Sequence, residues 1–166
     1  KYYQVHDVTL APRPKQQPYP PIWVGGRSDA AIRRAARYGS CWLGYLVSPN
    51  RLREAMQKVQ DMAPTYGRNP ADIQGGMLLF TALAKDYETG KEMAIANLSR
   101  RYNQPFDNLV DRYCAMGTPE QCLEQIQSFI DAGMRHLVFS FTCPAEQMPE
   151  QLGQCAKELL PRLRAL

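Results

Sequence analysis

The sequence predicts an α/β fold built from parallel strand–helix units. Short apolar runs bounded by Pro or Gly alternate about four times with longer segments whose apolar residues recur at helical spacing. The apolar runs do not alternate with polar residues, which is typical of parallel strands buried on both faces. The chain has 166 residues, 45% of them hydrophobic and 22% charged, which is ample for one domain with its own core.

Residues 1–21 form a Pro-rich lead-in to a domain predicted over residues 22–166. The five prolines within 12–21 forbid a helix there and disfavour a central strand. Four strands follow in the domain, and right-handed crossovers between them favour one parallel sheet with helices on its outer face. The predicted strands cover residues 22–24, 41–47, 77–84 and 137–142.

Capping signals mark where the helices begin and end. Ser28 precedes the first helix, which we expect Gly39 to end in a left-handed conformation. Ser48-Pro49 begins the second helix, and the capping box Thr118-Pro119-Glu120-Gln121 begins a later one, which ends at Gly133. Other helices are predicted over residues 89–101, in a short segment within 106–113, and over 148–166, where Pro161 should kink or terminate the helix.

Composition excludes several classes of function. The net charge is +4, but acids are interspersed with the arginines and no nucleic-acid motif accompanies them. The five cysteines include no Cys-x-x-Cys pair, and the histidines are two, so neither a disulfide framework nor a metal site is expected. No apolar run reaches the ~20 residues of a membrane span. We expect reduced thiols in the cytoplasm.

The turn Gly25-Gly26-Arg27-Ser28 is the candidate binding site. Glycines let the backbone approach an anion, and the first amides of the following helix are unpaired at the positive end of its dipole. The Ser28 hydroxyl could add a donor, and Arg27 could neutralise a phosphate. A plain strand-to-helix turn capped by Ser28 is the alternative, and the spacing matches neither a dinucleotide fingerprint nor a P-loop.

Two motifs resemble the luciferase-like monooxygenase superfamily. The first is Pro-Pro-Ile-Trp-Val-Gly-Gly-Arg-Ser at 20–28, followed by Arg-Arg-Ala-Ala-Arg-Tyr-Gly at 33–39 and Trp42. The second is Gly-Thr-Pro-Glu-Gln at 117–121, followed by Ala-Gly and His-Leu-Val in the last unit. The chain departs from the pattern at Ser40, where relatives often carry an acid.

The resemblance implies the C-terminal half of a (βα)8 TIM barrel. A whole barrel usually needs ~250 residues, so about four strand–helix units are absent. The cofactor implied is FMN or the deazaflavin F420, with its phosphate at Gly25, Gly26, Arg27 and Ser28, and the chemistry is monooxygenation or hydride transfer. Whether this chain alone is an enzyme stays open, because the resemblance places much of the substrate pocket in the absent half. The sequence lacks a starting Met, so we expect either a fragment or a chain whose first residues were removed or unobserved.

Three roles remain compatible with the sequence. The chain could be part of a flavin-dependent oxidoreductase, a non-catalytic half-barrel that binds flavin or another phosphorylated ligand, or an interaction protein. An open sheet edge and an apolar inner face would drive pairing with a missing N-terminal half or with a second copy as a homodimer. The residues predicted to line that inner face are Trp23, Leu43, Leu79 and Phe139.

Overall fold

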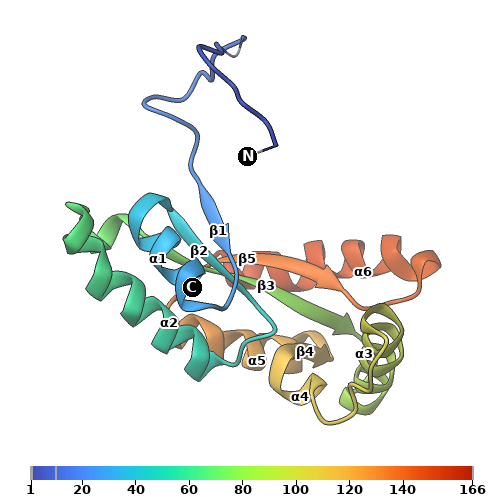
Figure 1. Ribbon diagram of the computed structural model, residues 1–166. Helices are drawn as coiled ribbons and strands as arrows, with labels where there is room; N and C mark the ends of the chain where they lie inside the picture. The colour runs from blue at the N-terminus through green and yellow to red at the C-terminus, as the bar shows by residue number, and fades with distance from the viewer. Residues whose placement is uncertain (1, 10, 166) are drawn as a thin grey trace.

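One sheet of five parallel strands organises the computed structural model, which describes residues 2–9 and 11–165 (Figure 1). The strands are β1 (Trp23–Gly25), β2 (Cys41–Tyr45), β3 (Gln74–Leu83), β4 (Cys114–Gly117) and β5 (Met134–Phe141). β1 pairs with β2, β2 with β3, and β3 with β5, all in parallel. The predicted α/β fold and the order of the four predicted strands are therefore confirmed.

The ten-residue strand β3 also accepts a strand that the sequence pattern missed. β2 pairs with the first half of β3, and β4 pairs with residues 80–83 on the same edge, while β5 occupies the opposite edge. β4 is Cys-Ala-Met-Gly, which is too short and too poor in β-branched residues to give a strand signal. β3 and β5 each begin three residues before the predicted start. The unexpected beginning of β3 contains Gly75 and Gly76.

Helices connect the strands, and α1, α2 and α5 cover one side of the sheet. The α-helices are α1 (Asp29–Tyr38), α2 (Pro49–Met62), α3 (Tyr87–Tyr102), α4 (Val110–Tyr113), α5 (Pro119–Asp131), α6 (Met148–Gln154) and α7 (Leu160–Leu163). Four short turns of other helical types complete the described chain: η1 (Ala63–Tyr66), η2 (Pro70–Asp72), η3 (Ala145–Gln147) and the π-helical turn η4 (Cys155–Leu159).

The predicted caps are confirmed. The Ser28 side chain accepts the Ala31 amide N–H, and Ser48 accepts that of Arg51. Thr118 and Gln121 form the reciprocal capping box at the start of α5. These caps depend on residues within one helical turn, which is why local sequence is enough to predict them.

Two helix ends differ from the prediction. Gly39 is extended, with φ −79° and ψ 146°, and not left-handed. The carbonyls at the end of α1 are instead bound by Arg68, whose Nη1 donates to the oxygens of Ala35, Ala36 and Gly39, the last at 2.6 Å. A distant guanidinium therefore supplements the one local bond, which the Gly39 amide donates to the Ala35 oxygen at 2.9 Å.

The last helix is interrupted before Pro161 and not at it. Residues 155–159 widen into the π turn, in which the Leu160 amide reaches back to the carbonyl of Cys155. Pro161 has no amide N–H to donate to the preceding turn, so the regular bonding pattern is broken there. The predicted end at Leu166 lies outside the described residues.

A large apolar core fills the space between the sheet and its outer helices. It joins Ile32 of α1, Leu52 of α2 and Phe129 of α5 to Met77 and Leu79 of β3. Trp42 and Leu83 are also fully buried in this core. Beyond the end of β5, the Gln151 side chain continues the sheet, because its amide exchanges two hydrogen bonds of 2.9 and 2.7 Å with the backbone of Leu83.

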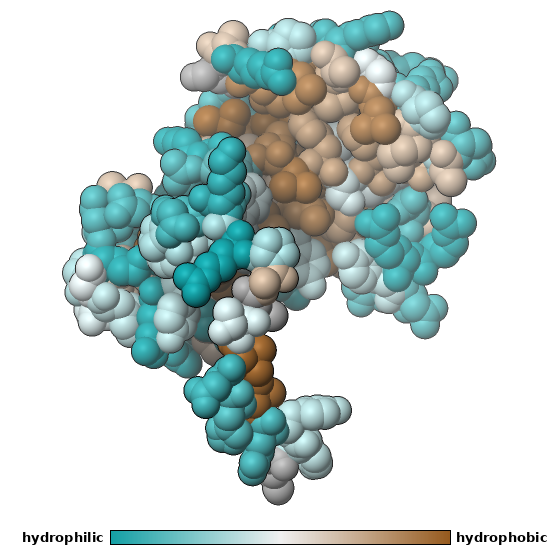
Figure 2. Space-filling model, turned by 90° about the horizontal axis from the view of Figure 1, so that it is seen from above, coloured by the Kyte–Doolittle hydropathy of each residue, from teal (hydrophilic) through white to brown (hydrophobic). Residues whose placement is uncertain are grey.

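The other face of the sheet is concave and partly open. Strand register and the alternation of side chains place these residues on it: Trp23, Cys41, Leu43, Tyr45, Gln74, Gly76, Leu78, Phe80, Ala82, His136, Val138 and Ser140. At its carboxyl end α3 and α4 cover Phe80 in a second core with Leu98 and Phe106. The rest stays open, and Figure 2 shows apolar residues gathered in a hollow on the face seen from above.

Two of the four residues predicted for this inner face are placed correctly. Trp23 is 42% exposed on the concave face, and Leu43 is half-buried there. Leu79 and Phe139 were assigned wrongly: they pair with each other in register but point to the helix-covered side. Because side chains alternate along a strand, an error of one position moves a residue to the other face.

The lead-in extends away from the sheet (Figure 1), and its described residues, 2–9 and 11–21, are all exposed. It carries exposed Tyr3, Val5 and Val8. No helix in the described part of the chain is both long and apolar enough to cross a membrane.

Replacing Arg68 with Ala should lower the free energy of unfolding by about 1–2 kcal/mol, because the terminal carbonyls of α1 lose a charged donor. Urea denaturation would show this as a lower midpoint with an unchanged slope. Arg33→Ala, on the exposed face of the same helix, is the matched control and should cost less than about 0.5 kcal/mol. Equal midpoints for the two variants would contradict the role given to Arg68.

Candidate functional site

The candidate turn lies between the carboxyl end of β1 and the first residue of α1. Gly26 has φ +117°, a conformation that residues with a side chain rarely adopt. A Cβ atom at this position would also stand 2.9 Å from the Cβ of Ala31. The chain therefore requires glycine at position 26 in order to enter α1 at this angle.

Two side-chain contacts hold the turn against β2 and the loop that follows it. The Trp42 indole Nε1 donates to the Gly26 carbonyl oxygen at 2.9 Å. The Arg27 Nη1 donates to the carbonyl oxygen of Leu46 at 3.1 Å, and the guanidinium lies 5.6 Å from the centre of the Tyr45 ring. Leu46 itself has φ +49°, which is uncommon for a non-glycine residue. Sequence reasoning missed both contacts, since their partners are 16 and 19 residues apart.

Several hydrogen-bond donors of the turn remain available. Within residues 2–9 and 11–165, the backbone amides of Arg27 and Ser28 have no protein acceptor. Arg27 uses one of its five N–H groups on Leu46, so the others can bind an anion at the same time. The Ser28 oxygen accepts from Ala31, which leaves its own O–H free to donate. The turn thus combines backbone amides, a hydroxyl and a cation.

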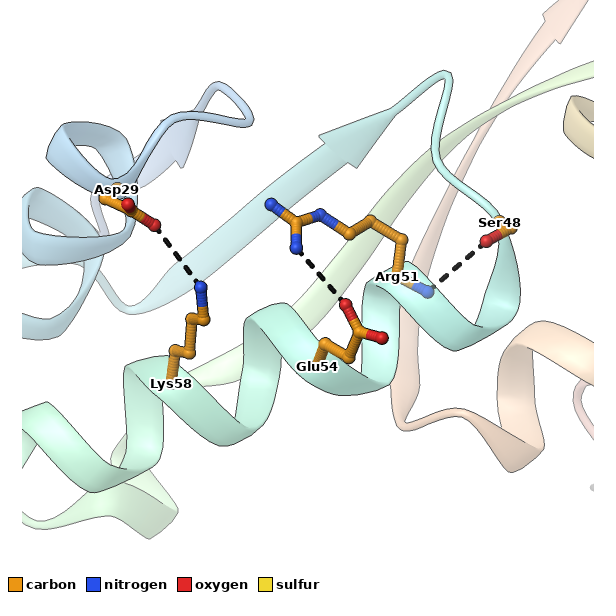
Figure 3. A network of polar contacts seen from close by, with 5 residues as sticks. All are labelled: Asp29, Ser48, Arg51, Glu54 and Lys58. Carbon is orange, nitrogen blue, oxygen red and sulfur yellow. Dashed lines mark hydrogen bonds and ion pairs between the residues drawn. The ribbon is translucent and has the colours of Figure 1, made fainter.

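A carboxylate at the first residue of α1 opposes anion binding, but it is partly neutralised. Asp29 lies next to Ser28, and its Oδ1 is 3.4 Å from the Nζ of Lys58 on α2. Figure 3 shows this pair at the C-terminal part of α2 and, nearer the start of that helix, the Arg51 side chain, whose Nη1 lies 3.2 Å from Oε2 of Glu54. All of these side chains are largely exposed, so the pairs screen the local field without fixing a rigid site.

The other aromatic and polar residues considered from sequence differ in how far they are buried. Trp42 and Phe80 are buried in the two cores, whereas Trp23 and Tyr45 remain exposed on the concave face. Thr81 is fully buried. In the described chain no cluster of three or more His, Cys, Asp or Glu side chains could hold a metal ion.

The thiols are unsuited to nucleophilic chemistry. All five cysteines are unpaired and buried. Burial raises the pKa of Cys41 to about 11 and the pKa values of Cys114 and Cys122 to about 12. Because the thiolate is the reactive form, these side chains stay protonated and inert at neutral pH.

A polar network that the sequence did not reveal joins α3 to α4. Asp111 accepts from the Tyr87 hydroxyl at 2.7 Å and from Lys91 at 2.9 Å. Burial, and then the bond to Asp111, raises the pKa of Tyr87 to about 12. Burial opposes ionisation of Asp111, yet the Lys91 and Tyr87 bonds hold its pKa below the usual value. The network fixes α4 on α3 and leaves no free acid or base.

The geometry defines half of a parallel (βα) barrel, with a turn that carries free backbone amides at the carboxyl end of its first strand. The sequence model of the family described as luciferase-like monooxygenase matches residues 1–136. The chain therefore belongs to the luciferase-like monooxygenase family.

Curated relatives include F420-dependent glucose-6-phosphate dehydrogenases. The protein of this name from Microbacterium testaceum is 26% identical over 187 residues, which cover 98% of this chain and 54% of the relative. The one from Nocardia farcinica is 37% identical over 174 residues, which cover 88% of this chain and 49% of the relative. The chain spans about half the length of the curated relatives it matches.

Solved structures show the same half-barrel. An F420-dependent secondary alcohol dehydrogenase, in complex with an F420-acetone adduct, superposes with a TM-score of 0.74 at 18% identity, covering 86% of this chain and 49% of that chain. The monooxygenase RslO1 from Streptomyces bottropensis gives 0.71 at 22% identity, covering 98% and 54%. These similarities establish the half-barrel fold.

Replacing Gly26 with Val should lower the free energy of unfolding by about 2 kcal/mol or more, through the strained φ and the contact with Ala31. Gly153→Ala is the control, because a Cβ there meets nothing within 4 Å. It should leave the urea midpoint unchanged or raise it slightly. A Gly26→Val variant as stable as the parent would show that the turn is not constrained as described.

Proposed function

We propose that this chain supplies the cofactor-phosphate half of a flavin- or F420-dependent oxidoreductase barrel. The observation that carries the proposal is the turn at Gly25, Gly26, Arg27 and Ser28, whose free amides and guanidinium point to an anionic ligand. FMN and F420 both carry a phosphate, so the turn suits either one. When bound, such a cofactor supplies the hydride or electron chemistry, while the chain binds and orients it.

The curated relatives favour F420 and hydride transfer, while the monooxygenases among the structural neighbours keep oxygen chemistry as an alternative. The curated relatives are named as F420-dependent dehydrogenases, and one structural neighbour carries an F420-acetone adduct. Neighbours with other names, such as a riboflavin lyase with modified FMN, keep FMN as the second candidate. Five unpaired thiols also suit the reducing cytoplasm that the sequence predicts.

Activity should require a second half of the barrel. The outer edges of β1 and β5 have no strand partner within the described residues. Exposed Trp23 and Val138 lie on the concave face that further strands would enclose in a whole barrel. We infer that an N-terminal half, of the kind that the relatives' additional length provides, closes the barrel and completes the site.

Binding without catalysis is the second candidate function. The turn is formed and tethered by residues of this chain alone, so it can hold a phosphate before any partner is present. If no N-terminal half accompanies the chain, the same open edges and apolar face favour a homodimer about a two-fold axis.

Replacing Arg27 with Gln should weaken FMN binding about tenfold, because a charge-assisted bond to the phosphate is lost. Fluorescence titration of FMN, repeated with inorganic phosphate as competitor, measures the effect. Arg34→Gln removes the same charge from an exposed position on α1 and should change affinity less than about twofold. Gly26 is unsuitable here, since its replacement strains the turn with or without ligand. Equal affinities of the two variants, or no binding by the parent, would reject the site.

The 166-residue chain should self-associate at micromolar concentration, because it exposes two sheet edges and an apolar face. Multi-angle light scattering should give about twice the monomer mass, and an added N-terminal half of a relative should compete with that dimer. Val138→Glu, on the open face, should shift the equilibrium to monomer, whereas the already exposed outer position Gln60→Glu should not. A parent chain that remains monomeric with no partner present would defeat this expectation.

A further inference from the structure

The open concave face has an apolar middle, and its strands carry no acid. Its floor is formed by Leu43, Leu78 and Val138, with Tyr45 at the carboxyl side. None of the five strands contains an Asp or Glu residue. A ligand on this surface therefore meets hydrocarbon below it and no negative charge from the strands.

One cation reaches this surface from the helices that cover its carboxyl end. Arg101 belongs to the last turn of α3 and is exposed. Its Nη1 donates to the Ser140 hydroxyl oxygen at 3.4 Å, and its guanidinium carbon lies 5.7 Å from the centre of the Phe80 ring. Ser140 and Phe80 are register partners on the concave face, so the guanidinium lies at the mouth of the half-barrel.

The Arg101 charge is not neutralised by any residue within 2–9 and 11–165. No carboxylate of the described residues lies within ion-pair distance of its guanidinium. A guanidinium that rests on an aromatic ring keeps its remaining N–H groups directed outward in a planar fork, which matches the two oxygens of a carboxylate, sulfonate or phosphate. The Ser140 hydroxyl can rotate to donate to the same oxygen atoms.

Comparison with the neighbouring Arg100 shows that a place in the last turn of α3 does not by itself explain the contacts of Arg101. Both arginines occupy the last turn of α3, where a positive charge suits the helix dipole. Arg100 instead lines a separate cavity of about 470 Å³ between α3 and the loop after β5, together with Asn97 and Glu146. The helix dipole favours a cation at both positions, so it does not explain why only Arg101 of the two contacts the concave face.

We propose that Arg101 and Ser140 bind the anionic group of a substrate whose apolar part lies against Tyr45, at the carboxyl-side rim that a closed barrel leaves open. The substrate class is an amphipathic anion, and Arg101 is the residue that selects it. The inference rests on the proposed oxidoreductase function, in which the cofactor phosphate has its own cation at Arg27 on the β1–β2 side of the rim. Because the two cations are separate, a substitution at Arg27 should affect cofactor binding and one at Arg101 should affect substrate binding.

A pair of matched fluorescent probes tests this without any cofactor. The dye 8-anilinonaphthalene-1-sulfonate carries a sulfonate on an apolar body, and N-phenyl-1-naphthylamine is the same aromatic framework without charge. With the full chain held below the micromolar range of self-association, titration with each dye should show that Arg101→Gln weakens sulfonate binding about tenfold and leaves binding of the uncharged dye within about twofold. The sulfonate affinity of the parent should also fall with added salt.

Arg100→Gln is the matched control, since it removes the same charge from the same helical turn, and it should change neither affinity by more than about twofold. Arg101→Lys should restore part of the sulfonate affinity, because it keeps the charge but loses the planar fork. Equal sulfonate losses in Arg100→Gln and Arg101→Gln would overturn the proposal. So would parallel losses of both dyes in Arg101→Gln, which would mark a structural role. The titration omits FMN, so its result is separate from that of the phosphate-site test.

Discussion

The backbone pairing of β3 is the constraint on which the rest of the structure depends. Its ten residues are bonded to β2 and β4 on one edge and to β5 on the other. Such close flanking strands require very small residues at its start: a Cβ at Gly75 would lie 2.8 Å from the Gly133 oxygen, and one at Gly76 would lie 2.7 Å from the Cys41 sulfur. Glycine at these positions lets β2, β3 and the turn before β5 come close together, and the positions of the connecting helices follow from this.

The two faces of β3 then divide the molecule by function. Odd-numbered residues such as Met77 and Leu79 enter the core beneath α1, α2 and α5, where burial stabilises the fold. Even-numbered residues such as Leu78 face the hollow, where they remain available to a ligand or to another part of a barrel. Stability and binding are thus assigned to alternate residues of one strand, and substitutions on the two sides should have separable effects.

Local signals in the sequence were sufficient for the fold and for the turn, and insufficient for the contacts between distant residues. Ser28 and Thr118 were identified as caps because capping needs only the next helical turn. α1 ends at Gly39 as predicted, but Gly39 is extended and not left-handed, and the carbonyls at the helix end are bound by Arg68 from another loop. The mouth cation Arg101 gave no sequence signal at all, because its meaning depends on Ser140, 39 residues away.

The bond between the Trp42 indole and the Gly26 carbonyl gives the turn an intrinsic optical reporter. The chain contains two tryptophans, and their environments are opposite: Trp42 is 1% exposed, while Trp23 is 42% exposed. Buried and solvated indoles emit at different wavelengths, so their signals are separable. Displacement of Gly26 should disturb the hydrogen bond from the Trp42 indole and so change the emission of Trp42. Closure of the concave face should instead change the emission of Trp23. The protein carries, without labelling, one chromophore for its turn and another for its open surface.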